Sequence, residues 1–363
     1  MIILSLSLQH IYGFDDFTID FSYPKKIVNS LINEEHLFGR ERFRYKKAVI
    51  LMGANATGKT CLGRAIKRIF DYIADSNPTH LFEMVTGEQG TFSIDFVNGD
   101  YRLQRLSGKI DFLQKKVSIS YFSSGIEAMD SYEKCVEKLK GKEINTSCIQ
   151  NTVGPFSARF AYPEIENSIS FRDIDKNILL ETLSAVIGTL DPTLCDISIS
   201  KDLKDTFIIR RKNKEIIIQE GKLLNSGLLS SGTTEGIDIA FFLASIIAKT
   251  SSFYYCDEHF SYIHSDIEKR IFSLMVCALG PNEQLIFTTH NTDMLDLNLP
   301  KHSYVFLRKC LEGDKITTHA ISASSILKRN TDSVRCAVEN DVFQTLPKDS
   351  LLDKLEMRYL NGE

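Results

Sequence analysis

The residues best suited to chemistry lie in the stretch GANATGKT, residues 53–60, which follows the apolar run AVILM and precedes a segment with helical spacing. Gly53 and Gly58 let the backbone turn its N–H groups inward around phosphate oxygens, and the next helix adds the positive end of its dipole. Lys59 is expected to reach the β- and γ-phosphates, and Thr60 to bind Mg²⁺. The stretch therefore predicts a site for ATP and Mg²⁺. The residues expected to surround the nucleotide are Gly53, Ala54, Asn55, Ala56, Thr57, Gly58, Lys59, Thr60 and Cys61.

Two adjacent carboxylates form a second candidate. The run SFYYC, typical of a buried strand, ends in Asp257 and Glu258. At the carboxyl end of a parallel strand, Asp257 can hold Mg²⁺ through water. Glu258 can orient and deprotonate an attacking water. By itself, a strand that ends in Asp-Glu is more often a pair of surface carboxylates, but the phosphate loop in the same chain favours the catalytic interpretation.

A histidine follows another short strand. The run QLIFTT ends at Thr289 and is followed by His290 and Asn291. A histidine at a strand tip beside a γ-phosphate can donate a hydrogen bond to it and so sense its presence. A lone histidine in such a place is more often a surface residue. The predicted catalytic set is therefore Lys59, Glu258 and His290, with Thr60 and Asp257 as the metal ligands.

Small polar residues open a long apolar helix in LLSSGTTEG, residues 228–236. The hydroxyls and N–H groups of Ser230, Ser231 and Gly232 make an anion site at a helix N-terminus. The alternative is an ordinary serine N-cap. Two helix N-termini of one sheet cannot easily face the same γ-phosphate. We therefore expect this turn to close over the nucleotide of a second copy of the chain.

The elements that position these groups alternate between strands and helices. Residues 1–23 predict two strands joined near Gly13, and residues 24–47 a loop with a short helix. Residues 90–122 predict strands with an Asn-Gly hairpin signal, and residues 125–190 look helical. CDISISKD and TFIIRRKNKEIIIQEGK return to strands. The run GTTEGIDIAFFLASIIAKT then has helical spacing, and SFYYC and QLIFTT flank a further helix. Such alternation is typical of an α/β fold with a parallel sheet.

Composition limits the partners and the compartment. The formal net charge is −4 and the pI about 6.1, so no global field attracts nucleic acid. The spacing of the eight Cys fits neither a zinc site nor a disulfide framework, which indicates reduced thiols. The longest apolar run, residues 237–248, is too short to span a bilayer and contains Asp238. The sequence therefore predicts a cytoplasmic protein without a membrane partner.

The order of these motifs resembles the ATP-binding-cassette (ABC) class of ATPases, in the branch with SMC-like heads and OLD-type ATPases. GANATGKT looks like Walker A, LSSGT like the ABC signature, FYYCDE like Walker B and TTHN like the His switch. The likeness is greatest to the compact ATPases of bacterial anti-phage systems, in which a Leu-His commonly follows the acidic pair, as Ile263-His264 does here. The match extends from residue 1 to about residue 310, strongly only at the motifs.

The resemblance implies an ABC-type P-loop ATPase head, α/β, with a mixed sheet, an antiparallel β subdomain and a helical insertion. It implies one domain over residues 1–363. The expected division is a nucleotide-binding core of residues 1–75 and 195–310, an insertion of residues 76–194 and a tail of residues 311–363. It also implies homodimers or higher homo-oligomers formed through ATP. Ser230, Ser231 and Gly232 would then face the nucleotide of the other protomer, and the region around His264 would be the D-loop.

Three departures shape the expected function. The Q-loop glutamine is not placed, with Gln89, Gln104 and Gln114 as candidates. Residues 60–230 contain no long coiled coil. No TOPRIM nuclease domain follows His290, since 73 residues remain after it (363 − 290). We therefore expect an ATPase of an anti-phage defence complex that controls a separate effector, a nuclease above all.

Two alternatives stay open. The basic stretches GRERFRYKKA and RRKNK favour a DNA-repair or recombination ATPase that clamps DNA, although a solvated basic face is the simpler interpretation. The other alternative is a nucleotide-gated scaffold with little hydrolysis.

Cys61 also has two interpretations. It follows Thr60 in the first helical turn, where a thiolate is favoured, or it is a small buried core residue.

Overall fold

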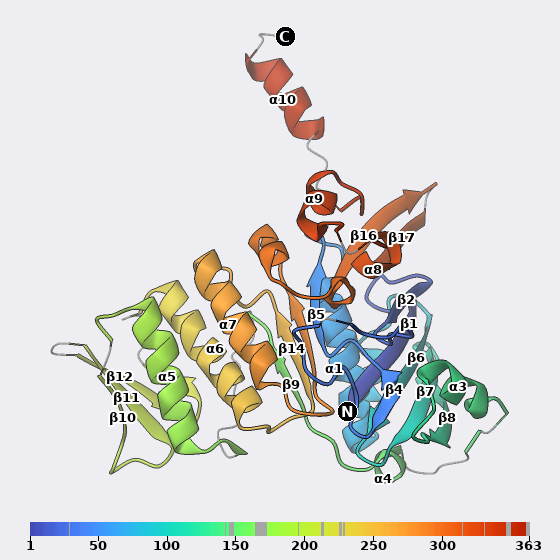
Figure 1. Cartoon of the computed structure of the whole chain (residues 1–363), viewed down its shortest axis with the longest axis horizontal. Helices are drawn as coiled ribbons and strands as arrows, with labels where there is room; N and C mark the ends of the chain where they lie inside the picture. Colours follow the sequence, from blue (N-terminus) through green and yellow to red (C-terminus); the bar gives the residue numbers. More distant parts are fainter. Residues whose placement is uncertain are drawn as a thin grey trace.

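Figure 1 shows the computed structural model of the chain, in which helices and further sheets pack on both faces of a central sheet. The structure describes residues 1–28, 30–141, 143–144, 149–163, 173–194, 196–211, 214–224, 227, 229–313, 315–329, 331–345 and 350–360.

The central sheet has the strand order β17-β16-β5-β15-β14-β9. Neighbours from β9 to β16 run parallel, and β17 is antiparallel to β16. The predicted parallel sheet is therefore confirmed, and the candidate motifs follow three adjacent strands. The strand bounds are β5 (Ala48–Met52), β9 (Ala158–Ala161), β14 (Phe253–Asp257), β15 (Gln284–Thr288), β16 (Tyr304–Glu312) and β17 (Lys315–Ser322).

Both faces of the central sheet are buried, which explains why its strands are continuous apolar runs. In β14, Tyr254 and Cys256 point into one core and Phe253 and Tyr255 into the other. The first core contains helices α5 (Lys176–Leu190), α6 (Ser231–Ile247) and α7 (Ser265–Ala278), which lie side by side in Figure 1. The second contains α1 (Lys59–Asp75) and the antiparallel sheet. Helix α1 is thus held between two sheets.

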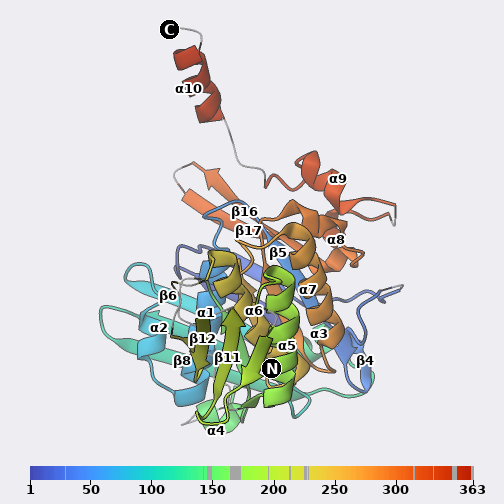
Figure 2. The same ribbon diagram turned by 90° about the vertical axis from the view of Figure 1, so that its left-hand side faces the viewer.

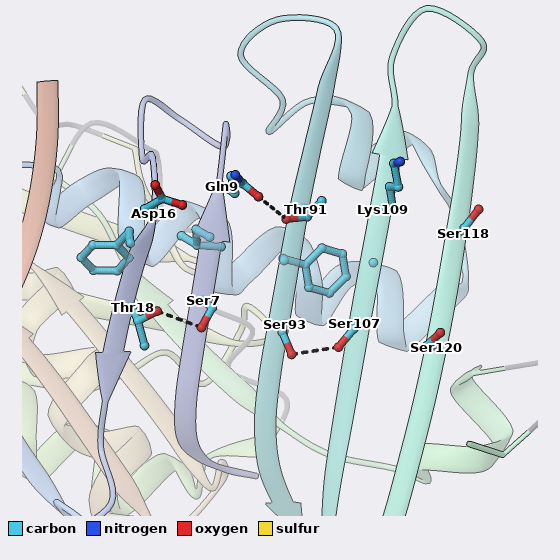
Figure 3. A pocket seen from close by; sticks show the side chains of 14 residues that line it. Ser7, Gln9, Asp16, Thr18, Thr91, Ser93, Ser107, Lys109, Ser118 and Ser120 are labelled. Atoms are coloured by element: carbon cyan, nitrogen blue, oxygen red, sulfur yellow. Dashed lines mark hydrogen bonds between the residues drawn. The ribbon is translucent and has the colours of Figure 1, made fainter. Parts of the chain in front are cut away.

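The antiparallel sheet has the order β2-β1-β6-β7-β8. It confirms the strands predicted at the N-terminus and in residues 90–122, and a hairpin turn at Gly99 joins β6 to β7. Its outer face is polar and forms a concave pocket of about 560 Å³, shown in Figure 3. There Ser7 hydrogen bonds with Thr18 at 3.0 Å and Ser93 with Ser107 at 2.8 Å. The strand bounds are β1 (Ile2–Gln9), β2 (Phe17–Asp20), β6 (Gln89–Asn98), β7 (Arg102–Asp111) and β8 (Lys116–Gly125).

A four-stranded sheet, β10-β11-β12-β13, packs with α5 at the far side of the first core, and β3 pairs with β4. Helix α10 lies away from the body in both Figure 1 and Figure 2. The remaining bounds are β3 (His36–Leu37), β4 (Arg40–Arg44), α2 (Thr79–Phe82), α3 (Tyr132–Leu139), α4 (Ile149–Val153), β10 (Asp196–Ile199), β11 (Thr206–Arg211), β12 (Lys214–Gln219), β13 (Lys222–Leu223), η3 (Thr292–Asp296), η4 (Lys301–Ser303), α8 (Ala323–Ile326), α9 (Val334–Glu339) and α10 (Ser350–Leu360).

Two expectations about the elements are wrong. Residues 125–190 are not helical throughout, because β9 lies within them and pairs with β14 in the central sheet. The described part of residues 24–47 contains β3 and β4 and no helix. Strand β17 (Lys315–Ser322) pairs with β16 within the segment predicted as a tail. For β9 the partner strand β14 lies far along the chain, so local spacing does not report the pairing, whereas β3 and β4 pair locally.

The predicted division into core, insertion and tail does not follow the sheets. Strands β1 and β2 lie in the predicted core but share a sheet with β6, β7 and β8 of the predicted insertion. The predicted insertion in turn supplies β9 to the central sheet. Among the described residues, no helix is long and apolar enough to cross a membrane.

Gly63 fixes the distance between α1 and the central sheet. A Cβ at this position would overlap the ring of Tyr255 in β14. We therefore expect Gly63→Ala to lower the free energy of unfolding by about 1–3 kcal/mol, because the core must move apart. Gly188→Ala in α5 is the matched control, since a Cβ there meets no atom within 4 Å. It should be neutral or stabilising by about 0.5–1 kcal/mol. Urea unfolding of both variants checks the difference, and equal midpoints would contradict it.

Candidate nucleotide-binding site

The loop between β5 and α1 has backbone angles and close contacts that its glycines allow. Gly58 has φ +103°, and a Cβ there would lie 2.7 Å from the Phe14 ring. A Cβ on Gly53 would lie 2.6 Å from the carbonyl oxygen of Leu307. Within the loop, the Thr57 hydroxyl donates to the carbonyl of Ala54 at 2.8 Å. Gly53 thus packs against β16, and Gly58 packs against the turn after β1.

Lys59 is buried at the start of α1 and lies at the centre of the site. Its ammonium donates to the carbonyls of Gly53 at 2.7 Å and Ala54 at 3.3 Å. It also lies 3.0 Å from Oε1 of Glu258. The backbone of α1 is anchored here as well, because the Tyr255 hydroxyl donates to the Lys59 carbonyl at 2.7 Å. A phosphate that binds Lys59 therefore competes with loop carbonyls and with a carboxylate.

Asp257 is buried at the carboxyl end of β14. The Thr288 hydroxyl donates to its Oδ1 at 2.7 Å, and the Thr60 side chain forms a second hydrogen bond with it. Burial raises the pKa of the Asp257 carboxyl above its ordinary value, and the two hydrogen bonds oppose that rise. The carboxylate and the Thr60 hydroxyl lie together, so this donor set fits a hard cation such as Mg²⁺.

Glu258 has a backbone conformation that is uncommon for a residue with a side chain, with φ +42°. Its N–H is held by Thr288, at 3.1 Å from the carbonyl oxygen and 3.0 Å from the hydroxyl. The side chain then reaches both Lys59 and His290, whose Nδ1 is 3.8 Å from Oε2. Strain of this kind persists where surrounding contacts enforce it, which is common at functional sites. The structure thus brings Lys59, Thr60, Asp257, Glu258 and His290 together.

Comparison with known proteins rests on solved structures, because no model of a protein family matches the sequence and no curated protein matches it. An SMC head bound to the C-winged helix domain of ScpA has 13% identity and a TM-score of 0.54, covering 91% of this chain and 100% of that one. A Pyrococcus furiosus SMC head bound to the C-terminal domain of ScpA has 12% identity and a TM-score of 0.53, covering 89% and 97%. The chain has the fold of an SMC head domain.

This match confirms the fold class expected from the sequence, an α/β head with parallel and antiparallel sheets. A Pyrococcus yayanosii SMC head with a coiled coil and joint gives a similar match, with 10% identity, a TM-score of 0.53 and coverage of 90% and 98%. At these identities the comparison concerns the fold alone. The roles of the individual site residues remain predictions that rest on the geometry described above.

Glu268 supports the segment that contains His290, a role that the sequence alone did not indicate. It is buried in α7, and its two carboxylate oxygens accept hydrogen bonds from the residues on either side of His290. Thr289 donates from its hydroxyl at 3.0 Å, and Asn291 from its side-chain amide at 2.5 Å. The amide of Asn291 also donates to the Ser265 hydroxyl at 3.0 Å. Glu268 is therefore a positioning residue for the strand tip that carries His290.

The Ser-Ser-Gly turn packs on the predicted D-loop. Ser230 caps α6, accepting the N–H of Thr233 at 3.2 Å, so the ordinary N-cap is present in the structure. A Cβ on Gly232 would lie 2.8 Å from the carbonyl oxygen of Tyr262. Ser230 and Ser231 are exposed, which leaves them accessible to a second copy of the chain. Their predicted role toward a partner's nucleotide stays a prediction.

Glu235 joins this turn to the segment after the acidic pair. It is buried in α6, and its carboxylate accepts the N–H groups of Ser261 at 3.2 Å and Tyr262 at 2.9 Å. Burial raises the pKa of its carboxyl, and these hydrogen bonds oppose the rise. Glu235 lies within the stretch LLSSGTTEG, but its residue type and spacing gave no signal for this role. Two hydrogen bonds therefore connect the helix that begins with the Ser-Ser-Gly turn to the predicted D-loop segment.

The structure bears on two questions that the sequence left open, the state of Cys61 and the Q-loop residue. Burial raises the pKa of the half-buried Cys61 thiol, so the structure supports the small core residue and not a thiolate. Among the Q-loop candidates, Gln104 is buried in the antiparallel sheet and accepts a hydrogen bond from the Tyr121 hydroxyl at 2.9 Å. Gln89, through its side-chain amide, and Gln114, through its backbone N–H, both donate hydrogen bonds to Asp111, the last residue of β7. The Q-loop residue is thus still not placed.

The carboxyl group of Asp238 in α6 makes the free energy of unfolding depend on pH. Burial, and then Glu235, raise its pKa from 3.8 to about 6. The neighbouring His259 has its pKa lowered to about 4 by burial, so the two side chains, 3.7 Å apart, are not an ion pair at neutral pH. Because the folded pKa of Asp238 is raised, its contribution to stability is present below pH 4 and is lost as the pH rises through 6.

We therefore expect Asp238→Asn to be more stable than the wild-type chain at pH 8, by roughly 2 kcal/mol, and this advantage to shrink at pH 5. Denaturant unfolding at both pH values measures it. The matched control is Asp100→Asn, since Asp100 is an exposed carboxylate in the turn between β6 and β7. It should keep the wild-type pH dependence. An Asp238→Asn variant that is equally destabilised at both pH values would contradict the prediction.

Proposed function

We propose that the chain binds and hydrolyses ATP and that nucleotide-dependent dimerisation controls a separate effector in an anti-phage complex. The observation that carries the ATPase proposal is the Lys59–Glu258 contact of 3.0 Å at the ends of two adjacent elements. It places the cation that would bind the γ-phosphate beside the carboxylate that would activate water. The SMC-head fold supports the same activity.

Each of the site residues would have a separate role in ATP hydrolysis. Loop N–H groups and Lys59 bind the phosphates of the substrate and withdraw negative charge from the γ-phosphate. Glu258 accepts a proton from the attacking water, and His290, beside it, orients that water or the γ-phosphate. Thr60 and Asp257 would hold Mg²⁺, which when bound neutralises charge on the phosphate oxygens. Thr288 keeps both acidic residues in place through its hydroxyl.

Dimerisation would complete the site. The exposed Ser230 and Ser231 at the N-terminus of α6 offer hydroxyl and N–H donors to an anion. A γ-phosphate bound at Lys59 of one protomer would meet this turn of the other. Glu235 would then transmit closure to the D-loop segment, since it holds the N–H groups of Ser261 and Tyr262. The effector would sense the closed dimer.

The DNA-clamp alternative finds little support in the basic stretches that suggested it. Lys46 and Lys47 are buried, and both donate to backbone carbonyls. Arg40 donates to the carbonyl of Ile126. Arg210 contacts Glu215 and Asp196 on neighbouring strands. All four of these cations form hydrogen bonds or ion pairs within the fold, which weakens the support that the two stretches give to DNA binding. We therefore favour a defence ATPase with an effector in trans.

Phosphate release from ATP tests the proposal. With Mg²⁺, the purified chain should release phosphate and Lys59→Ala should not. DNA and RNA in the same reactions should stay intact, because the nuclease is a separate chain. Cleavage by this chain alone would overturn the proposal of an effector in trans. Tight ATP binding without hydrolysis would instead favour the nucleotide-gated scaffold.

A further inference from the structure

A second pocket lies where the edges of two sheets meet, away from the phosphate loop. Strand β2 is at the edge of the antiparallel sheet and β17 at the edge of the central sheet. These edges lie side by side at the right of Figure 1, close to α8. Between them is a pocket of about 320 Å³, the seam pocket, which is large enough for a small ligand. Its lining includes no residue of 53–60.

The seam pocket is lined by three lysines and one carboxylate. Lys25 and Lys328 are exposed at its rim, and Lys46 is buried. The carboxylate is Asp20, whose Oδ1 already accepts the N–H of Ser22 at 2.7 Å. The hydroxyl groups of serines in β17 and α8 add neutral donors to the wall. The lining therefore carries a net positive charge and favours an anion.

Lys46 is the residue that most needs a partner. It is 5% exposed, and its ammonium donates to the backbone carbonyl of Asp20 at 2.7 Å. Among the described residues, no carboxylate forms an ion pair with that ammonium. Burial lowers its pKa to about 8, and the charge of Asp20 only partly offsets this. Buried charges are normally paired. An anion bound in this pocket would therefore offset the free-energy cost of burying the Lys46 ammonium without a counter-charge.

The position of Lys46 links the seam pocket to the phosphate loop. Lys46 precedes β5, and the loop begins at Gly53 where that strand ends. The two points are roughly 20 Å apart along an extended strand, so a ligand in the pocket does not touch the nucleotide. We propose that the seam pocket binds a small phosphate-bearing molecule, held by Lys46 with Lys25 and Lys328 at the rim. Phosphate suits this set because its oxygens accept several charge-assisted hydrogen bonds.

Phosphate titration of the whole chain tests this inference independently of ATP hydrolysis. All variants carry Lys59→Ala, which removes the lysine of the phosphate loop. Inorganic phosphate binding is followed by calorimetry in phosphate-free buffer. Adding Lys46→Met, which keeps the aliphatic stem, should weaken binding by about tenfold or more, the effect of one lost charge-assisted contact. The matched control is Lys47→Met, because Lys47 is also buried but donates to the Asn33 carbonyl, outside the pocket.

Two further binding measurements can refute the proposal. Lys25→Glu alters an exposed residue, so it should weaken phosphate binding without affecting folding. Ribose 5-phosphate should bind and ribose should not, which identifies phosphate as the recognised group. Equal phosphate affinity with and without the Lys46→Met substitution would overturn the proposal. So would loss of all phosphate binding on Lys59→Ala alone, because phosphate would then occupy only the loop.

Discussion

Replacing Glu258 by Gln is expected to lower the rate of ATP hydrolysis by about 100-fold or more and to leave ATP binding intact. The amide keeps the shape of the side chain but cannot take a proton from water. It also removes the charge that lies 3.0 Å from the Lys59 ammonium, so a phosphate meets less competition for that lysine. ATP-bound dimers of the variant should therefore accumulate. Phosphate release and mass in solution, each with and without ATP and Mg²⁺, measure the two effects.

The matched control is Glu83→Gln, which makes the same change at an exposed carboxylate paired with Arg68. It should hydrolyse ATP as the wild-type chain does. A Glu258→Gln variant that retains wild-type hydrolysis would show that another group is the base. A mass that never responds to ATP would show that nucleotide does not close a homodimer, or that closure requires the effector.

Replacing Ser231 by Glu is expected to abolish both ATP-dependent dimerisation and hydrolysis. Ser231 is exposed in the first turn of α6, where a carboxylate is favourable for the helix, so the fold should be kept. In the closed dimer the same carboxylate would face the partner's γ-phosphate and repel it. Ser118→Glu is the control, because it adds the same charge to an exposed serine of β8, labelled in Figure 3. It should leave hydrolysis unchanged.

Mixing two inactive variants separates action in trans from action within one chain. Lys59→Ala keeps an intact Ser-Ser-Gly turn, and Ser231→Glu keeps an intact phosphate loop. A mixed dimer therefore contains one complete site. An equimolar mixture should recover about a quarter of the wild-type rate if protomers pair at random and the sites are independent. A mixture as inactive as its two components would place the Ser-Ser-Gly turn outside the composite site.

Local sequence determined the parts of this protein that depend on neighbouring residues. The phosphate loop, the strands that end in Asp257 and Thr288, and the hairpins of the antiparallel sheet follow from periodicity, glycine positions and turn signals. The catalytic candidates could be grouped before the fold was known, because carboxyl ends of adjacent parallel strands meet at one edge of a sheet. Their detailed contacts were not part of that prediction.

Only the tertiary structure decided which distant residues support the site. Strand β9 joins the central sheet by pairing with β14, far along the chain, although its segment looked helical. Glu268 and Glu235 look like surface carboxylates of amphipathic helices until burial gives them partners. Phe14 closes against Gly58 across 44 residues of sequence (58 − 14). Such contacts depend on how whole elements pack, and the spacing of residues within one element carries no record of them.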